Sequence, residues 1–133
     1  MEESVQITYE ESQLIYQDLC GRIPYGVAYR FKSSTAEDPK PHFLDQMNGW
    51  TTFFIQQGYI MAYLRPLSSM SEEERKEFWE IGGVMTYDTE LNQWLVVELS
   101  LAALEFVNRK HLDYNNLIPK GLALVAPEDM YKD

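Results

Sequence analysis

The chain is poor in the residues that form disulfides and zinc sites. Cys20 is its only cysteine, so no intrachain disulfide can form. The residue falls among apolar neighbours in a predicted helix, and we expect a reduced, packed thiol. The two histidines, His42 and His111, lie far apart in the sequence, whereas zinc sites need three or four ligands at characteristic spacing. We therefore expect neither a metal nor another cofactor.

The glycine-rich and acidic signatures of phosphate and calcium sites are also missing. Phosphate-binding loops place clustered glycines ahead of a helix, whereas Gly82-Gly83 follows a predicted helix and stops it. The acidic run Glu72-Glu73-Glu74 is explained by helix capping, and no stretch follows the alternating-acid pattern of an EF-hand loop. Neither chemistry is predicted.

Positive charge is scarce: 11 Lys and Arg residues against 21 Asp and Glu give a net charge of -10. Nucleic acids and anionic membrane surfaces are bound mainly through Lys and Arg, so both are disfavoured as partners. An acidic surface suits solubility, a basic protein partner, or competition with nucleic acid for a basic protein. No leader pattern and no apolar run of transmembrane length is present, so we expect a cytoplasmic protein.

What is present predicts one α+β domain over residues 1–133. A chain of this length with 45% hydrophobic residues can bury one core. Capping boxes begin two helices, with Thr8 and Glu11 in the first and Ser71 and Glu74 in the second. A wide apolar stripe after Ser100 predicts a third. The expected helices cover residues 8–21, 71–82 and 100–111.

The segments between these helices predict a mainly antiparallel sheet of four to six strands, covered by the three helices. Aromatic, β-branched or alternating runs occur at residues 27–32, 50–56, 59–64, 84–87, 93–98 and 122–125. We expect the second and third of these runs to pair as a hairpin through Gln57-Gly58. The fourth and fifth are expected to pair around residues 88–92. Residues 33–41, rich in Ser, Thr, Asp and Pro, are the best candidate for a mobile loop.

Two Ile-Pro-x-Gly segments, at residues 23–26 and 118–121, are typical of type I turns. Each is expected to lead into an apolar extended segment. The flanking sequences are not similar, so we interpret the two segments as the same type of turn occurring twice and not as an internal repeat.

The aromatic residues gather in the first predicted hairpin, where Trp50, Phe53, Phe54, Tyr59 and Tyr63 occur close together. Adjacent residues of a strand point to opposite faces. Either both faces of this hairpin are covered within the monomer, or one aromatic side chain is offered to a partner.

Three motifs resemble a known family. They are DLCGRIPYGV at residues 18–27, YLRPLSSMSEEE at 63–74 and HLDYNNLIPKGLALVAPEDMY at 111–131. Together they look like a family of small uncharacterised proteins encoded by Bacteroidales genomes, their prophages and their phages. Asn115-Asn116 stands where Arg-Gly is usual, and Asp129 where Gly is usual. The resemblance implies a single-domain, intracellular or phage-associated protein and carries no activity or site residues.

The motif residues lead to two interpretations of the same segments. In the first, their role is structural: the connectors at residues 65–70 and 113–121 pack against one another, with an ion pair between Arg65 and Asp113. Alternatively, a groove that binds a peptide or small ligand is lined by Tyr25, Arg65, His111, Asp113 and Tyr114.

Three functional hypotheses remain open at this stage. The leading one is a non-enzymatic interaction or accessory protein of phage or mobile-element origin, with a basic protein as its partner. The second is an acidic mimic that occupies a nucleic-acid-binding surface. The third is a small enzyme in which His111 acts as a base oriented by Asp113, although a helix-terminal histidine contact explains His111 better. The sequence predicts no oligomeric state.

Overall fold

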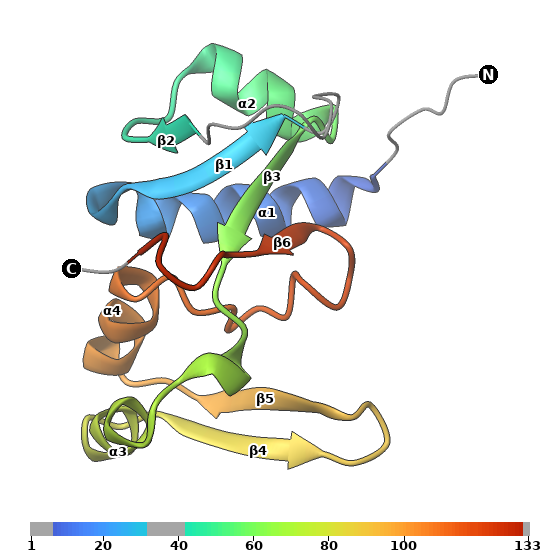
Figure 1. Cartoon of the computed structure of the whole chain (residues 1–133). Helices are drawn as coiled ribbons and strands as arrows, with labels where there is room; N and C mark the ends of the chain where they lie inside the picture. Colours follow the sequence, from blue (N-terminus) through green and yellow to red (C-terminus); the bar gives the residue numbers. More distant parts are fainter. Residues whose placement is uncertain (1–6, 32–41, 132–133) are drawn as a thin grey trace.

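The computed structural model of the chain describes residues 7–31 and 42–131. Within these ranges the fold is mixed α+β, which confirms the predicted class; it has four α-helices, where about three were expected, and two sheets (Figure 1). The elements in chain order are α1 (Tyr9–Arg22), η1 (Ile23–Tyr25), β1 (Val27–Phe31), β2 (His42–Leu44), α2 (Gly49–Gln56), β3 (Ile60–Leu64), η2 (Leu67–Ser69), α3 (Glu72–Glu80), β4 (Val84–Asp88), β5 (Gln93–Glu98), α4 (Leu101–Arg109) and β6 (Ala123–Val125).

The predicted capping boxes begin α1 and α3. The Glu11 N–H donates to Thr8 Oγ1 at 3.0 Å, and the Thr8 N–H donates to Glu11 Oε1 at 2.9 Å. Ser71 and Glu74 make the equivalent pair, at 3.1 and 3.0 Å. Each box satisfies two backbone donors that the helix itself leaves without a partner. These helix starts are therefore confirmed.

The prediction of a strand at residues 50–56 is wrong, because this segment is the helix α2. The Asn48 side chain caps its N-terminus, accepting a hydrogen bond from the Thr51 N–H at 2.9 Å. Ile55 is buried in the core while its neighbours along the helix are more exposed. Helix capping by Asn and helical burial outweigh the β-propensity of the aromatic residues. The first predicted hairpin is not formed.

The strands divide between two sheets instead of one. The larger sheet has the order β2-β1-β3-β6, in which β3 pairs antiparallel with β1 and parallel with β6. The hairpin β4–β5 forms a separate antiparallel sheet, as predicted for its two strands. The predicted loop at residues 33–41 lies outside the described residues.

Both predicted Ile-Pro-x-Gly turns are formed. The Gly26 N–H donates to the Ile23 carbonyl at 3.1 Å, and the Gly121 N–H donates to the Ile118 carbonyl at 3.0 Å. Gly26 and Gly121 have φ of 71° and 77°, in the left-handed region that favours glycine. The turns deliver β1 and β6 to the same sheet.

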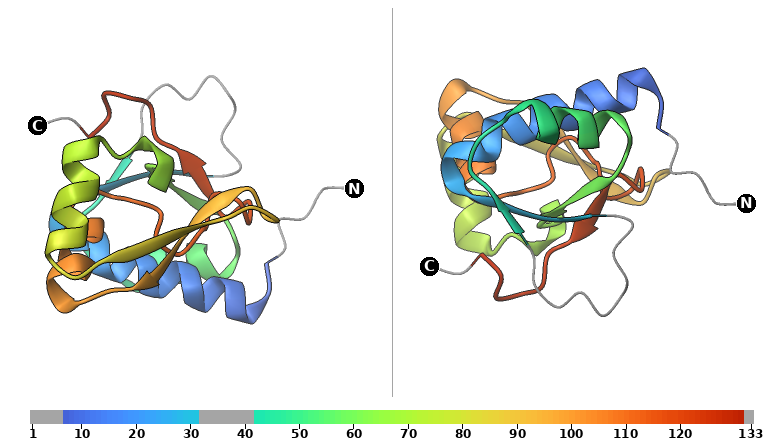
Figure 2. Two further views of the ribbon diagram at one scale, coloured as in Figure 1. Left: turned by 90° about the horizontal axis from the view of Figure 1, so that it is seen from below. Right: turned by 90° about the horizontal axis from the view of Figure 1, so that it is seen from above.

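Buried apolar side chains form two separate cores. Helices α1 and α2 lie side by side on one face of the larger sheet and enclose the first core (Figures 1 and 2). The second core lies between η2, α3, α4 and the β4–β5 hairpin. The segments that connect β3 to η2 and α4 to β6 pass between the two cores (Figure 1).

Cys20 is exposed, so the prediction of a packed thiol is wrong. The apolar Ile15 and Leu19 do belong to the buried stripe of α1, but Cys20 lies off it. That stripe also includes polar residues and consists of Ser12, Ile15, Asp18, Leu19 and Arg22.

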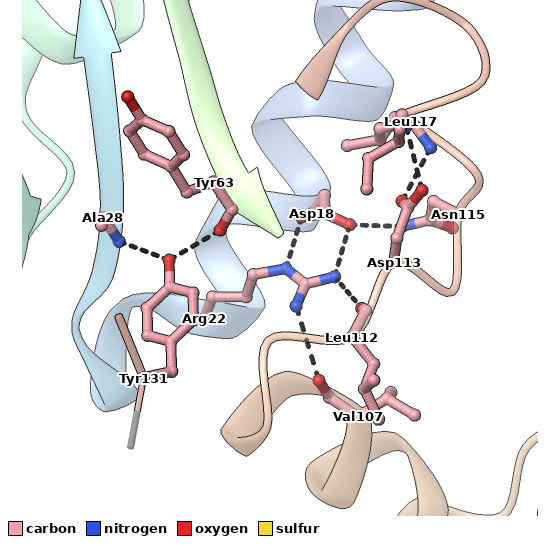
Figure 3. Close-up of polar contacts among 11 residues, drawn as sticks. Asp18, Arg22, Ala28, Tyr63, Val107, Leu112, Asp113, Asn115, Leu117 and Tyr131 are labelled. Atoms are coloured by element: carbon pink, nitrogen blue, oxygen red, sulfur yellow. Dashed lines mark hydrogen bonds and ion pairs between the residues drawn. The ribbon is translucent and has the colours of Figure 1, made fainter. Parts of the chain in front are cut away.

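The C-terminal Tyr131 fastens the segment after β6 to the larger sheet. Its hydroxyl accepts a hydrogen bond from the Ala28 N–H at 2.8 Å and donates one to the Tyr63 carbonyl at 2.6 Å (Figure 3). One side chain therefore connects β1 and β3 with the end of the chain.

Replacing Tyr131 with Phe removes both bonds and leaves a backbone donor without its partner. We expect Tyr131→Phe to lower the free energy of unfolding by about 1–3 kcal/mol, measured by urea denaturation. Tyr9→Phe is the matched control, because Tyr9 is exposed. Equal effects of the two substitutions would contradict the fastening role.

Candidate functional site

The predicted groove residues come from three parts of the chain. They lie at the end of η1, just after β3, and in the connector after α4, and they are Tyr25, Arg65, His111, Asp113 and Tyr114. The two connectors do dock, through their backbones. The Arg65 N–H donates to the His111 carbonyl at 2.8 Å, and the Asp113 N–H donates to the Arg65 carbonyl at 2.9 Å.

The predicted ion pair between Arg65 and Asp113 is wrong. The Arg65 guanidinium binds both carboxylate oxygens of Glu74, at 2.7 and 3.0 Å. The buried Asp113 carboxylate accepts the Leu117 N–H at 2.7 Å and the Ile118 N–H at 2.9 Å (Figure 3). Burial raises the pKa of Asp113, while these two backbone bonds act in the opposite direction. Asp113 therefore organises the connector that leads to β6.

His111 is buried and lies behind Tyr131, whose ring stacks on the imidazole at a centroid distance of 4.0 Å. Its Nε2 lies 3.1 Å from the Tyr25 carbonyl oxygen. A carbonyl only accepts, so Nε2 carries the proton. Burial, and next the positive charge of Arg22, lower the pKa of His111 to about 4. The imidazole makes no hydrogen bond to Asp113, so the geometry lends no support to a catalytic His–Asp pair.

A buried ion pair lies at the junction of the two cores. Asp18 and Arg22 are 1% and 0% exposed, and their carboxylate and guanidinium groups meet at 2.6 and 3.1 Å (Figure 3). The guanidinium also donates to the Leu112 carbonyl at 2.6 Å and the Val107 carbonyl at 3.4 Å. Asn115 Nδ2 donates to Asp18 Oδ2 at 2.8 Å, so this oxygen accepts from both Asn115 and Arg22. Such pairing offsets the cost of removing two charges from water.

Tyr114 covers this ion pair. The Arg22 guanidinium carbon lies 5.3 Å from the centre of the Tyr114 ring, within the range of a cation–π contact. Burial raises the pKa of Tyr114, so its hydroxyl stays protonated at neutral pH. Four of the five predicted groove residues therefore stabilise the fold, through an ion pair, hydrogen bonds to the backbone or ring contacts. The fifth, Tyr25, contributes its backbone carbonyl to the contact with His111.

Arg65 alone of the five lines a large cavity, of about 590 Å³, which we call the cationic pocket. It lies between α3, α4 and the segment after β6. Its charged and aromatic walls are Arg65, Glu74, Arg109, Lys110, Glu128 and Tyr131. Sequence reasoning assigned Glu74 to a helix cap and gave Arg109 and Lys110 no role in a site, so it did not connect them. The one signal was a pair of adjacent cations, Arg109-Lys110, in an acidic chain.

A second candidate surface lies on α2, where Trp50, Phe53, Phe54 and Tyr59 form what we call the aromatic face. Phe54 is at its centre, with ring centroids 6.2 Å from Trp50, 5.8 Å from Phe53 and 6.3 Å from Tyr59. Phe31 of β1 packs edge-on against Phe54 from the core side, at 5.3 Å. Trp50 is 73% exposed and Phe53 46%. The exposed rings of Trp50 and Phe53 therefore pack on Phe54, which in turn packs on Phe31.

Within residues 7–31 and 42–131, no cluster of three or more His, Cys, Asp and Glu side chains could hold a metal ion. None of the helices described is long and apolar enough to cross a membrane. No protein-family model, curated protein or solved structure matches the chain.

Breaking the buried ion pair should be among the most damaging single changes. Asp18→Asn or Arg22→Met leaves one group buried without its charged partner, and we expect a loss of about 3–5 kcal/mol in the free energy of unfolding. The double substitution Asp18→Leu with Arg22→Met removes both charges and should cost less than the sum of the single changes. Urea denaturation at pH 7 measures all three. Single losses no larger than that of the exposed control Lys76→Met would refute this role.

The buried neutral His111 should make stability depend on pH. Its folded pKa of about 4 lies below the ordinary value of 6.5. Between these values the unfolded chain binds a proton that the folded chain excludes, so stability falls as the pH is lowered. The contribution is complete above about pH 6.5, and about 2 kcal/mol should be lost between pH 7.5 and 5.

His111→Asn tests this pH dependence, because Asn does not titrate and tolerates the positive φ of 56° at this position. Asp18, Arg22 and Arg65 also act electrostatically on His111, and they stay unchanged in the variant. Comparing urea denaturation of the two proteins from pH 7.5 to 5 isolates the histidine. Identical pH dependence in both would disprove its role.

Proposed function

We propose that the protein is a non-enzymatic interaction or accessory protein that docks a basic protein partner on the aromatic face of α2. The observation that carries this proposal is the exposure of Trp50 and Phe53 on an aromatic base. Large rings exposed together are uncommon on a surface with no partner, and Trp is the residue most enriched at binding hot spots.

The aromatic face is already organised for binding. Phe54 is held by Phe31 from below and contacts the rings of Trp50 and Phe53. A partner therefore meets side chains whose positions are largely fixed, which lowers the entropic cost of association.

Charge supports a basic partner. The chain carries a net charge of -10, and residues 42–64, which include the whole aromatic face, contain no Lys or Arg. Opposite charge on the partner speeds encounter and disfavours acidic competitors. The resemblance to proteins of Bacteroidales phages and prophages fits an accessory protein of a mobile element acting in the cytoplasm.

The acidic-mimic alternative requires acids in rows at phosphate-like spacing. Helix α3 is the most acidic of the elements, yet it also contains Arg75 and Lys76. The enzyme alternative requires the His111–Asp113 contact that is absent from the site. Both alternatives therefore have less support than docking on the aromatic face.

The test is affinity capture from the native host with the wild-type chain and with Trp50→Ala/Phe53→Ala. We expect a basic protein, identified by mass spectrometry and reconstituted at fixed stoichiometry, to bind at least tenfold more weakly to the double variant. Trp79→Ala is the matched control, because Trp79 is 66% exposed on α3, away from the aromatic face. It should bind as the wild type does.

Two results would overturn the proposal. One is a partner whose binding survives the double variant. The other is self-association of the purified wild-type chain that the double variant abolishes, since the aromatic face would then be a contact between two copies. Light scattering after size-exclusion chromatography separates these cases.

A further inference from the structure

The cationic pocket reverses the charge balance of the chain. Three of the 11 Lys and Arg residues line it, and only two of the 21 Asp and Glu residues do. A pocket with the same proportions of acidic and basic residues as the whole chain would carry a negative charge. Cations have instead been brought together from two separate places: the residue after β3, and the last residue of α4 with the residue that follows it.

The Glu74 charge in this pocket is already neutralised. Arg65 binds it with two hydrogen bonds and also donates to Ser69 Oγ and to the Ser69 carbonyl, both at 3.2 Å. The side-chain hydrogen bond from Arg65 is the main reason that the pKa of Glu74 falls to about 2. Arg65 and Glu74 thus form a rigid wall that carries almost no net charge.

The remaining cations are Arg109 and Lys110. Lys110 Nζ forms an ion pair with Glu74 at 3.5 Å, longer than a direct hydrogen bond, and lies 5.8 Å from the centre of the Phe106 ring. The exposed Arg109 lies over the same ring at 5.6 Å, and no described carboxylate pairs with it. Only Glu128 opposes the two across the pocket.

We propose that the cationic pocket binds a small molecule that carries phosphate or carboxylate groups, with Arg109 and Lys110 contacting the anion. The pocket is lined by a guanidinium and an ammonium from adjacent residues, and both groups match the oxygens of phosphate or carboxylate. The volume of about 590 Å³ is that of a site for a small organic molecule. Pro66, Ala126 and Pro127 provide apolar walls for the rest of the ligand. This site is separate from the aromatic face, so either proposal can fail without the other.

Inorganic phosphate, pyrophosphate and citrate are suitable probes, since they separate phosphate from carboxylate recognition. We expect at least one to bind saturably in calorimetric titration and to shift the amide NMR signals of Ser69, Glu74 and Ala126. Arg109→Gln/Lys110→Gln should weaken that binding at least tenfold.

The control is Lys76→Gln/Lys120→Gln, which removes the same charge at two exposed positions outside the pocket and should change affinity less than twofold. Glu128→Gln removes the opposing charge and should strengthen binding several-fold, which keeps the test decisive if the first variant folds poorly. Absence of saturable binding by all three probes would overturn the proposal. Equal weakening by the two double variants, or unchanged affinity in Glu128→Gln, would do the same.

Discussion

The buried ion pair between Asp18 and Arg22 is the interaction on which the rest of the structure depends. It comes from the last two turns of α1, and its hydrogen bonds reach the end of α4 and the connector beyond it. These segments carry parts of both cores, so the pair determines how the two are placed. An apolar junction would bury as much surface without specifying this geometry, because apolar contacts are not directional.

The same constraint explains why the most distinctive sequence motifs are found here. The connector after α4 has to leave the helix, satisfy Arg22 with its carbonyls and turn back towards the larger sheet. Asp113 holds that turn through two backbone bonds, and His111 fills the space beneath Tyr131. The Asp113 carboxylate is buried and occupied by two backbone donors, and the His111 ring is buried against Tyr131, so both side chains serve the fold. Binding is therefore to be sought on the outer surfaces of the fold.

The sequence revealed those features whose signals are local. Two capping boxes, two proline-glycine turns and the β4–β5 hairpin are each specified by a few adjacent residues, and all are formed. The prediction of a strand at residues 50–56 failed because short aromatic runs occur in strands and helices alike. The cap formed by Asn48 favours the helix.

The ion pair and the cationic pocket were missed for a different reason. Sequence patterns treat charged residues as exposed. The buried face of α1, which includes Asp18 and Arg22, was therefore not recognised, and Cys20 was wrongly placed among the packed residues. Arg65 has many acids that could pair with it, and only the folded backbone selects Glu74 nine positions later. The cationic pocket combines residues from β3, α3, α4 and the C-terminal segment, and no spacing rule joins these.

The net charge of -10 acts in opposite ways on the two proposed binding surfaces. It attracts a basic partner over distances of about the Debye length, roughly 8 Å at physiological salt. The same charge repels a small anion until that anion reaches the cationic pocket, where Arg109 and Lys110 act at contact distance. Binding on the aromatic face thus gains from the global field, whereas the pocket has to overcome it locally. Because Glu74 is paired with Arg65, the charge that an anion meets in the pocket is set by Arg109 and Lys110, which outnumber Glu128.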